Sequence, residues 1–396
     1  MNDLCVMKFG GTCLSTEEDR LRSADLCIRE LESYRRAVVV VSAMGRKGDP
    51  YSTDSLLDLV SAPIPHEKSC LLACGEVISA AVFADMLRQK GIAAIAVTGW
   101  NAGLRTDEQH CGADLESIEI EYLNASLEEN DCVVVAGFQG MSSSGTVSTL
   151  GRGGSDITAT AIAAALEAAT LMLFKKIDSV YTADPESVPG ALKVDRISAE
   201  DLRQLAWLGA EVVHPRASEI AGDAGIRISI KSHSTGEPVT EIEPFVIRSG
   251  KYITGVAAGS DAVQFRISAD SYTSLHEFYS NAFGLVADAG VSMDMFSVFN
   301  GAAMFTVPLE DEERVSEVLI GNGIICETIS PCAKVSIVGA GMHGIEGVMA
   351  RFSAALDRAG IDMLQTVDSH ATISALVPLH QRDEALRVLH REFLEQ

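Results

Sequence analysis

The chain has 396 residues, of which 47% are hydrophobic, so it is long enough for more than one domain with a buried core. Its formal net charge of −24 argues against nucleic acids and anionic membranes as partners, because both are negatively charged. Small anionic substrates remain compatible with this charge, since a local basic pocket can override the overall field. The nine cysteines form no CxxC pair, which favours free thiols in a reducing cytoplasm over disulfides or a zinc site.

Short apolar runs alternate with helical patterns in the first 240 residues. The apolar runs predict strands at residues 4–9, 37–41, 92–97, 133–136, 171–174 and 227–232, and the run at 37–41 is typical of a strand buried on both faces. The segments between them predict helices, at residues 15–34, from about residue 55, at 71–90 and at 156–168. Strands that alternate with helices form a mostly parallel sheet with helices on both faces. Ligands of such sheets bind beside the carboxyl ends of the strands.

The pattern changes after about residue 250, where an internal duplication begins. Residues 283–295, FGLVADAGVSMDM, are similar to residues 352–364, FSAALDRAGIDML, at a separation of 69 residues. Each copy is long enough for a βαββαβ unit. We therefore expect three domains, at residues 1–240, 252–327 and 333–396.

The first candidate site follows the first predicted strand, in the sequence Lys8-Phe9-Gly10-Gly11-Thr12. Two glycines let backbone N–H groups approach an anion, and a lysine neutralises its charge. The competing interpretation is a simple turn after a surface lysine. The spacing GxxxxGK[ST] is absent, so this motif is not a P-loop.

The second candidate site precedes the helix predicted at residues 156–168 and reads Gly151-Arg152-Gly153-Gly154-Ser155-Asp156. Three glycines at a helix N-terminus form an anion site. Arg152 can bind a carboxylate with two hydrogen bonds, and Asp156 can orient the lysine or a metal ion. The competing interpretation is a helix capped by Ser155 or Asp156, and both interpretations can hold together.

Two further motifs are weaker. Cys74-Gly75-Glu76 is expected to open a helix, where Glu76 either binds a substrate ammonium or is favoured in the first turn by the helix dipole. Residues 339–344, GAGMHG, satisfy the GxGxxG pattern, and Asp362 follows at a suitable distance. Only 52 residues follow Gly344, too few for a complete dinucleotide-binding domain, so we interpret this motif as a loop of the duplicated unit.

In this order, the motifs resemble the aspartate kinases of the amino-acid kinase family, over essentially the whole chain. The matching pieces are VMKFGGTC (6–13), VVVVSAMGRKGDPYSTDSLL (38–57), LLACGEVISA (71–80), VVVAGFQG (133–140), LGRGGSDITA (150–159), VYTADPE (180–186) and GAEVVHPRA (209–217). The tail resembles the paired ACT regulatory domains of that family, in VGAGMHGIEGV (338–348) and QTVDSHATIS (365–374). The insert GRKGDPYSTD is most similar to a Gram-positive subgroup that includes diaminopimelate-inhibited isozymes.

The resemblance implies an α/β amino-acid kinase fold with a mostly parallel sheet flanked by helices, followed by two ferredoxin-like βαββαβ ACT domains. It implies transfer of the ATP γ-phosphate to the side-chain carboxylate of L-aspartate, the first step towards lysine, diaminopimelate, threonine and methionine. ATP, with Mg²⁺ bound to it, is the implied cofactor. Feedback control by an amino-acid effector at the ACT domains, a homo-oligomer built through them and a cytoplasmic location are implied in the same way.

The resemblance also implies roles for individual residues. The catalytic residues would be Lys8 and Asp156. The aspartate substrate would contact Glu76 through its α-ammonium, Arg152 through its α-carboxylate, and also Thr53, Gly153, Gly154 and Ser155. The nucleotide would contact Lys8, Phe9, Gly10, Gly11, Ser42, Tyr181, Thr182, Ala183, Asp184 and Pro185.

Several positions depart from the family pattern. Ser is replaced by Cys13, a Thr-Asp pair by Lys175 and Lys176, Gly by Ser179, Arg by Glu186 and Lys by Glu211. Glu186 and Glu211 remove two cations near the ATP phosphates, while Lys175 and Lys176 add two elsewhere. One hypothesis is a rearranged nucleotide site that still works, and the other is a catalytically weakened regulatory or sensor paralogue. Sibling kinases that act on glutamate, acetylglutamate, carbamate or UMP are further alternatives, but the motif wording favours aspartate.

Overall fold

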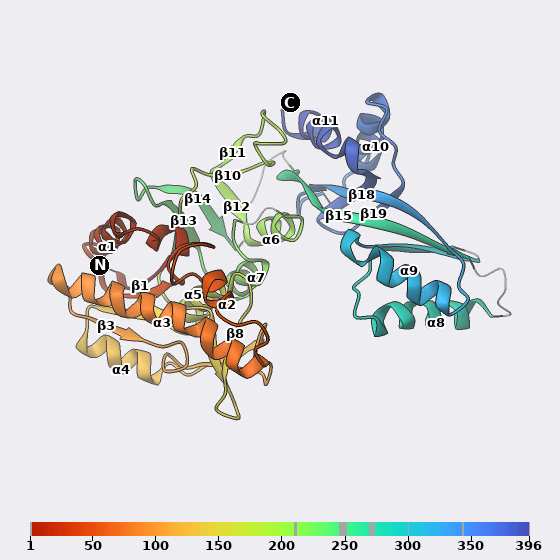
Figure 1. Cartoon of the computed structure of the whole chain (residues 1–396). Coiled ribbons are helices and arrows are strands. Elements are labelled where there is room, and N and C mark those ends of the chain that lie inside the picture. The colour runs from red at the N-terminus through yellow and green to blue at the C-terminus, as the bar shows by residue number, and fades with distance from the viewer. Residues whose placement is uncertain are drawn as a thin grey trace. The chain divides into compact units, whose positions relative to one another are not determined.

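The computed structural model describes residues 2–209, 212–244, 252–268, 274–299, 301–342 and 344–395. The chain forms two compact units (Figure 1). The first unit comprises Met1–Val180, Lys193–Ala206 and Glu211–Ile247, and the second comprises Tyr181–Leu192, Trp207–Ala210 and Arg248–Gln396. Two short segments of the expected 1–240 domain therefore group with the C-terminal part of the chain.

The first unit is built around an eight-stranded sheet in the order β12-β14-β13-β9-β1-β2-β6-β3. Its strands are β1 (Asn2–Phe9), β2 (Tyr34–Val41), β3 (Ala94–Val97), β6 (Cys132–Ala136), β9 (Leu171–Lys175), β12 (Arg196–Ser198), β13 (Ile228–Ser232) and β14 (Pro238–Glu243). Neighbouring strands are parallel, apart from the antiparallel pair β13–β14. The expected mostly parallel sheet is thus confirmed, with two strands, β12 and β14, that the sequence did not reveal.

Helices cover both faces of this sheet. The helices of the first unit are α1 (Glu17–Leu31), α2 (Thr53–Leu57), α3 (Pro65–Gln89), α4 (Glu121–Glu129), α5 (Gly154–Ala165), α6 (Ala199–Trp207) and α7 (Pro215–Ala224), with a short 3-10 turn, η1 (Gly11–Leu14). Residues of α1 and α3 share one core with alternate strand residues such as Met7 and Val39. Helix α5 packs on the strands β1, β2 and β9, which places it against the opposite face.

Smaller strand pairs, none of them expected from the sequence, complete the first unit. The four-stranded sheet β5-β4-β7-β8 consists of β4 (Leu104–Thr106), β5 (Leu115–Ile118), β7 (Gln139–Ser142) and β8 (Val147–Thr149). A two-stranded ribbon joins β10 (Val180–Tyr181) to β11 (Lys193–Val194). These strands are only two to four residues long, too short to show a hydrophobic period.

Helix α3 starts earlier than expected. It begins at Pro65, which suits the first helical turn because proline has no N–H to lose there. The prediction that Cys74-Gly75-Glu76 opens a helix is therefore wrong, and Glu76 lies in the middle of α3. Among the described residues α3 is also the one helix long and apolar enough to cross a membrane, but half of its most apolar stretch is buried inside the structure, as in a core helix.

The second unit contains the duplicated tail. Its six strands form one antiparallel sheet in the order β16-β17-β15-β18-β20-β19. They are β15 (Gly255–Ser268), β16 (Asp294–Phe299), β17 (Ala302–Pro308), β18 (Cys326–Val338), β19 (Gln365–Asp368) and β20 (Thr372–Pro378). The helices are α8 (Leu275–Asp288), α9 (Glu312–Gly321), α10 (Val348–Arg358) and α11 (Arg382–Leu394), with 3-10 turns η2 (Leu309–Asp311) and η3 (Leu379–Gln381).

The two copies of the repeat share their longest strands. The order α8-β16-β17-α9 recurs as α10-β19-β20-α11, as the duplication predicts (Figure 1). Strands β15 and β18 pair along both halves, from Ile267 opposite Cys326 to Gly255 opposite Val338. The expected division between residues 327 and 333 therefore falls inside β18. The GAGMHG motif follows this strand in an antiparallel sheet, which is no dinucleotide-binding fold, and its His343 lies outside the described residues.

Candidate active site

The carboxyl end of β1 carries the lysine of the first motif. Met7 and Phe9 belong to the core shared with α1 and α3. Because successive strand residues point to opposite faces, Lys8 points towards α5. Its Nζ lies 2.7 Å from Oδ1 of Asp156, and both side chains are buried. The two glycine-rich motifs, 148 residues apart in sequence, thus meet in one ion pair.

Gly153 determines how Asp156 reaches this position. It is the N-cap of α5 in the left-handed conformation, with φ of 68°, and a Cβ there would lie 2.5 Å from Cδ2 of His214. An N-cap at Ser155 or Asp156 is therefore wrong, since both residues lie within the first helical turn. Burial alone would raise the pKa of Asp156, but the ammonium groups of Lys175 and Lys8 hold it well below its usual range.

Lys175 is the second cation beside Asp156. Its Nζ lies 3.2 Å from Oδ2, so each carboxylate oxygen faces one ammonium group. Burial lowers the pKa of Lys175, and the attraction of Asp156 opposes that shift. The sequence identified Lys175 as a departure from the family pattern but did not place it in the site. The sequence alone could not do so, because residue 175 joins the face of Lys8 only through the pairing of Leu173 with Lys8 in the sheet.

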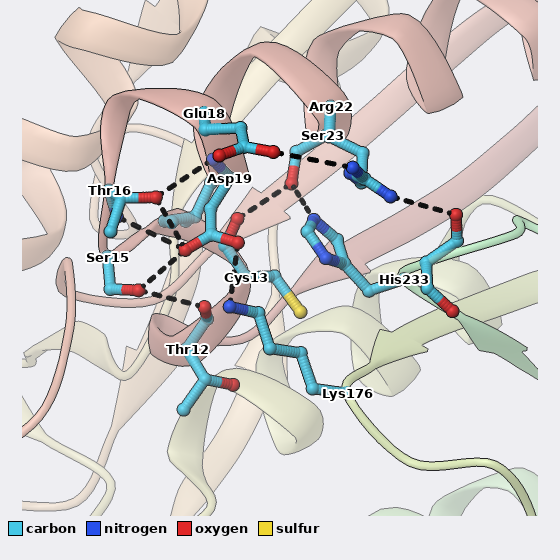
Figure 2. Close-up of polar contacts among 12 residues, drawn as sticks. Thr12, Cys13, Ser15, Thr16, Glu18, Asp19, Arg22, Ser23, Lys176 and His233 are labelled. Carbon is cyan, nitrogen blue, oxygen red and sulfur yellow. Dashed lines mark hydrogen bonds and ion pairs between the residues drawn. The ribbon is translucent and has the colours of Figure 1, made fainter.

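The neighbouring lysine has a different partner. Figure 2 shows Lys176 directed at Asp19, with Nζ 2.6 Å from Oδ1. Asp19 also forms the capping box of α1 with Thr16 and accepts a hydrogen bond from Ser15. Partial burial would raise the pKa of Asp19, but the hydrogen bonds from Lys176, Thr16 and Ser15 hold it below its usual range. Lys176 therefore stabilises the start of α1.

Cys13, another departure, belongs to the core. It is fully buried, its Sγ donates to the carbonyl of Phe174 at 3.4 Å, and burial raises the pKa of its thiol. Its carbonyl accepts a hydrogen bond from Ser23, whose hydroxyl also bonds Nε2 of His233 (Figure 2). The thiol thus packs against the sheet instead of facing a ligand.

Glu76 is buried in the middle of α3, and only one of its two carboxylate oxygens accepts a hydrogen bond from a described residue. The N–H of Ala43 donates to Oε1 at 3.1 Å, while Oε2 has no hydrogen-bond partner in the part of the chain that the structure describes. Burial raises the pKa of Glu76 to about 8. A buried acceptor without a partner costs free energy, so this oxygen is suited to a ligand ammonium.

The Lys8 loop and the Glu76 region are connected by the loop after β2. The N–H of Gly45 donates to the carbonyl of Gly11 at 2.9 Å, and the N–H of Ser42 donates to that of Phe9. A Cβ at Gly11 would lie 2.6 Å from the carbonyl oxygen of Ala43, so only glycine allows this approach. The cation-binding and anion-binding parts of the site therefore share one backbone framework.

The other expected substrate contacts also lie in the first unit. Arg152 is exposed and has no hydrogen-bond or ion-pair partner among the described residues. Gly154 and Ser155 are buried at the start of α5, and Thr53 is the half-buried first residue of α2. Gln139 was not expected: its side chain is buried, and Nε2 donates to the carbonyl of Ala73, while Oε1 has no hydrogen-bond partner within the described ranges. No sequence signal distinguished it.

The expected nucleotide-binding segment, Tyr181–Pro185, groups with the second unit. The hydroxyl of Thr182 lies 2.8 Å from Nε2 of His390 in α11 and accepts a hydrogen bond from the N–H of Leu192. Ala183 belongs to the core of the second unit. The departure Glu186 is exposed, and the departure Glu211 lies outside the described residues.

The fold and this site define a class of protein that the comparisons also find. A family model described as the amino acid kinase family matches residues 3–232, and one described as an ACT domain matches residues 327–391. The structure is similar to Escherichia coli aspartokinase III in complex with aspartate and ADP, with a TM-score of 0.80, 21% identity and full coverage of both chains. It is also similar to the aspartate kinase of Clostridium acetobutylicum, with a TM-score of 0.81, 20% identity and coverage of 98% of this chain and 100% of the other. These two likenesses show the fold.

Curated relatives are more similar in sequence. Aspartokinase 1 of Bacillus subtilis is 38% identical over 98% of both chains. The aspartokinase of Geobacillus stearothermophilus is 34% identical over 98% of this chain and 97% of its own length. The chain therefore belongs to the aspartokinases of the amino acid kinase family.

Proposed function

We propose that this chain is an aspartate kinase, which transfers the γ-phosphoryl group of ATP to the side-chain carboxylate of L-aspartate. The observation that carries this proposal is the buried ion pair between Lys8, at the end of β1, and Asp156, at the start of α5. It is joined by the buried carboxylate of Glu76, whose Oε2 has no hydrogen-bond partner among the described residues. The relatives of matching length are named aspartokinases, and one similar structure contains aspartate and ADP, which supports the same substrates here.

Phosphoryl transfer to a carboxylate depends on positioning the two substrates more than on acid–base catalysis. The side-chain carboxylate of aspartate is ionised at neutral pH, so it attacks the γ-phosphorus without a general base. The activation barrier arises because two anions must approach each other in line. Cations and a fixed geometry lower this barrier. Lys8 supplies positive charge, Asp156 holds its ammonium in place, and Mg²⁺ arrives with the nucleotide. The products are an acyl phosphate and ADP.

The remaining roles are proposed from the site's geometry and from the family pattern. Glu76 binds the α-ammonium of aspartate through Oε2, and the exposed guanidinium of Arg152 binds the α-carboxylate. Thr53, Gly153, Gly154 and Ser155 complete the substrate side. The family pattern assigns nucleotide contacts to Phe9, Gly10, Gly11 and Ser42 in the first unit. It assigns a further nucleotide-binding segment to Tyr181, Thr182, Ala183, Asp184 and Pro185.

The second unit is proposed to regulate this activity. The protein is proposed to act in the cytoplasm. An amino-acid effector that binds one conformation more tightly than another shifts the balance between them. Lysine, threonine and diaminopimelate are the effectors to test. The proposed oligomeric state is a homo-oligomer assembled through the six-stranded sheet.

A coupled assay for ADP release tests the activity. Purified protein with ATP-Mg²⁺ should release ADP with aspartate and much more slowly with glutamate, and one of the three candidate effectors should inhibit it. Calorimetry that detects no ATP binding at millimolar ATP-Mg²⁺ would overturn the proposal in favour of a non-catalytic sensor. Light scattering on the same sample measures the oligomeric state.

A further inference from the structure

The end of β9 places a lysine on the active-site face of the sheet. Leu173 lies opposite Lys8 in the pairing of β9 with β1, so Lys175, two residues further on, emerges on the same face. Its Nζ lies 3.2 Å from Oδ2 of Asp156, and that of Lys8 lies 2.7 Å from Oδ1. The carboxylate therefore holds two ammonium groups side by side.

The charges of this cluster do not balance. With both lysines protonated, Lys8, Lys175 and Asp156 together carry one positive charge in excess, and their side chains are only 9%, 19% and 7% exposed. Two cations close together in a poorly solvated place repel each other, and a single carboxylate compensates only one of them. An incoming anion with several oxygens would satisfy both, as a phosphoryl group does.

Lys176, the next residue, has its charge neutralised by a single carboxylate. It pairs with Asp19 at the start of α1, as Figure 2 shows. Its side chain is 42% exposed. The two adjacent lysines thus differ in burial and in charge balance, although both replace residues of the family pattern. Only Lys175 joins the cation cluster of the site.

We propose that Lys175 is a second phosphate-binding cation of the active site, which together with Lys8 binds the terminal phosphoryl oxygens of ATP. This inference rests on the proposed function. As the bond between the γ-phosphorus and the β–γ bridging oxygen breaks and the bond to the aspartate carboxylate forms, negative charge moves onto ADP. Two ammonium groups held by Asp156 stabilise that charge without any proton transfer.

The test compares Lys175→Met with Lys176→Met, which removes an adjacent lysine of the same length. Calorimetry gives Kd for ATP-Mg²⁺ and for AMP, and the ADP-release assay gives kcat and both KM values. We expect Lys175→Met to weaken ATP binding about 10-fold, as for a lost hydrogen bond to a charged group. We expect kcat to fall about 100-fold, while AMP binding and KM for aspartate change less than about threefold. Lys176→Met should leave nucleotide binding within about twofold of wild type.

A second variant distinguishes loss of the lysine charge from a folding defect. Lys175→Arg keeps the charge, so it should bind ATP more tightly than Lys175→Met, and melting temperatures identify variants that are not folded. A folded Lys175→Met protein with wild-type ATP affinity and kcat would overturn the inference, as would equal losses in Lys176→Met. Wild-type protein that binds ATP but releases no ADP with aspartate refutes the proposed activity alone, and the ATP measurements still decide the role of Lys175. Wild-type protein that binds no ATP overturns both.

Discussion

The two units bury different kinds of polar side chain. Among the described residues, the buried Lys, Asp and Glu side chains all belong to the first unit, namely Lys8, Glu76, Asp156 and Asp201. The second unit buries hydroxyl and amide groups that bond each other, such as Gln264 with Gln365 at 2.9 Å and Ser336 with Ser374 at 2.7 Å. Burying charge costs folding free energy, whereas paired neutral groups cost little. We attribute this cost at Lys8, Glu76 and Asp156 to the binding of charged ligands.

The largest effect is expected from removing the central cation of the first unit. Lys8→Ala should lower kcat by about 1,000-fold, because the transferring phosphoryl group loses its nearest positive charge. KM for aspartate should change less than threefold, since Lys8 is assigned to the nucleotide side. Steady-state kinetics with both substrates measures this, and a variant that changes KM for aspartate but keeps kcat would reverse the assignment.

Glu76→Gln should act on the aspartate side of the same unit. Its uncharged amide cannot pair with the substrate ammonium, so we expect KM for aspartate to rise about 100-fold, as when one partner of a buried charge pair is removed. Turnover at saturating aspartate should fall less. A KM for aspartate equal to that of wild type would exclude Glu76 from ammonium binding.

The raised pKa of Glu76, about 8, makes aspartate binding depend on pH. Below this pKa the free carboxyl is mostly protonated, and pairing with an ammonium requires loss of that proton. KM for aspartate should therefore fall about tenfold between pH 6 and pH 7 and level off above pH 8. Glu76→Gln is the matched control, because its KM should not follow this profile. A flat profile in wild type would contradict the buried, protonated state.

A smaller change is expected at the exposed edge of the site. Arg152→Ala should raise KM for aspartate about tenfold, through loss of a charge-assisted hydrogen bond to the α-carboxylate. Its melting temperature should stay that of wild type, because Arg152 has no partner among the described residues. An unchanged KM would assign the α-carboxylate to another group.

The smallest effect is expected in the second unit, at a buried hydroxyl group. Thr182→Val removes the hydroxyl that bonds His390 and accepts the N–H of Leu192, which should destabilise the second unit by about 1–2 kcal/mol. Hydrogen exchange should increase in residues 181–192 and can be compared with Glu186→Gln, an exposed substitution in the same segment. Equal exchange in both variants would show that the buried hydroxyl adds no stability there.

The sequence by itself determined the parts that depend on neighbouring residues. Apolar runs predicted the central strands, the glycine-rich motifs predicted two loops at strand and helix ends, and the similarity of residues 283–295 to 352–364 predicted the duplication. These features follow from local backbone preferences and from the period of apolar residues, which a single sequence displays.

Only the tertiary structure decided which distant groups meet. Strand pairing brought Lys175 to Asp156 and turned Lys176 towards Asp19. The length of α3 left Glu76 buried, with one carboxylate oxygen that no described residue bonds, and packing grouped residues 181–192 with the second unit. Such contacts join residues far apart in the chain, so their energies depend on register and burial, which no local pattern of residues specifies.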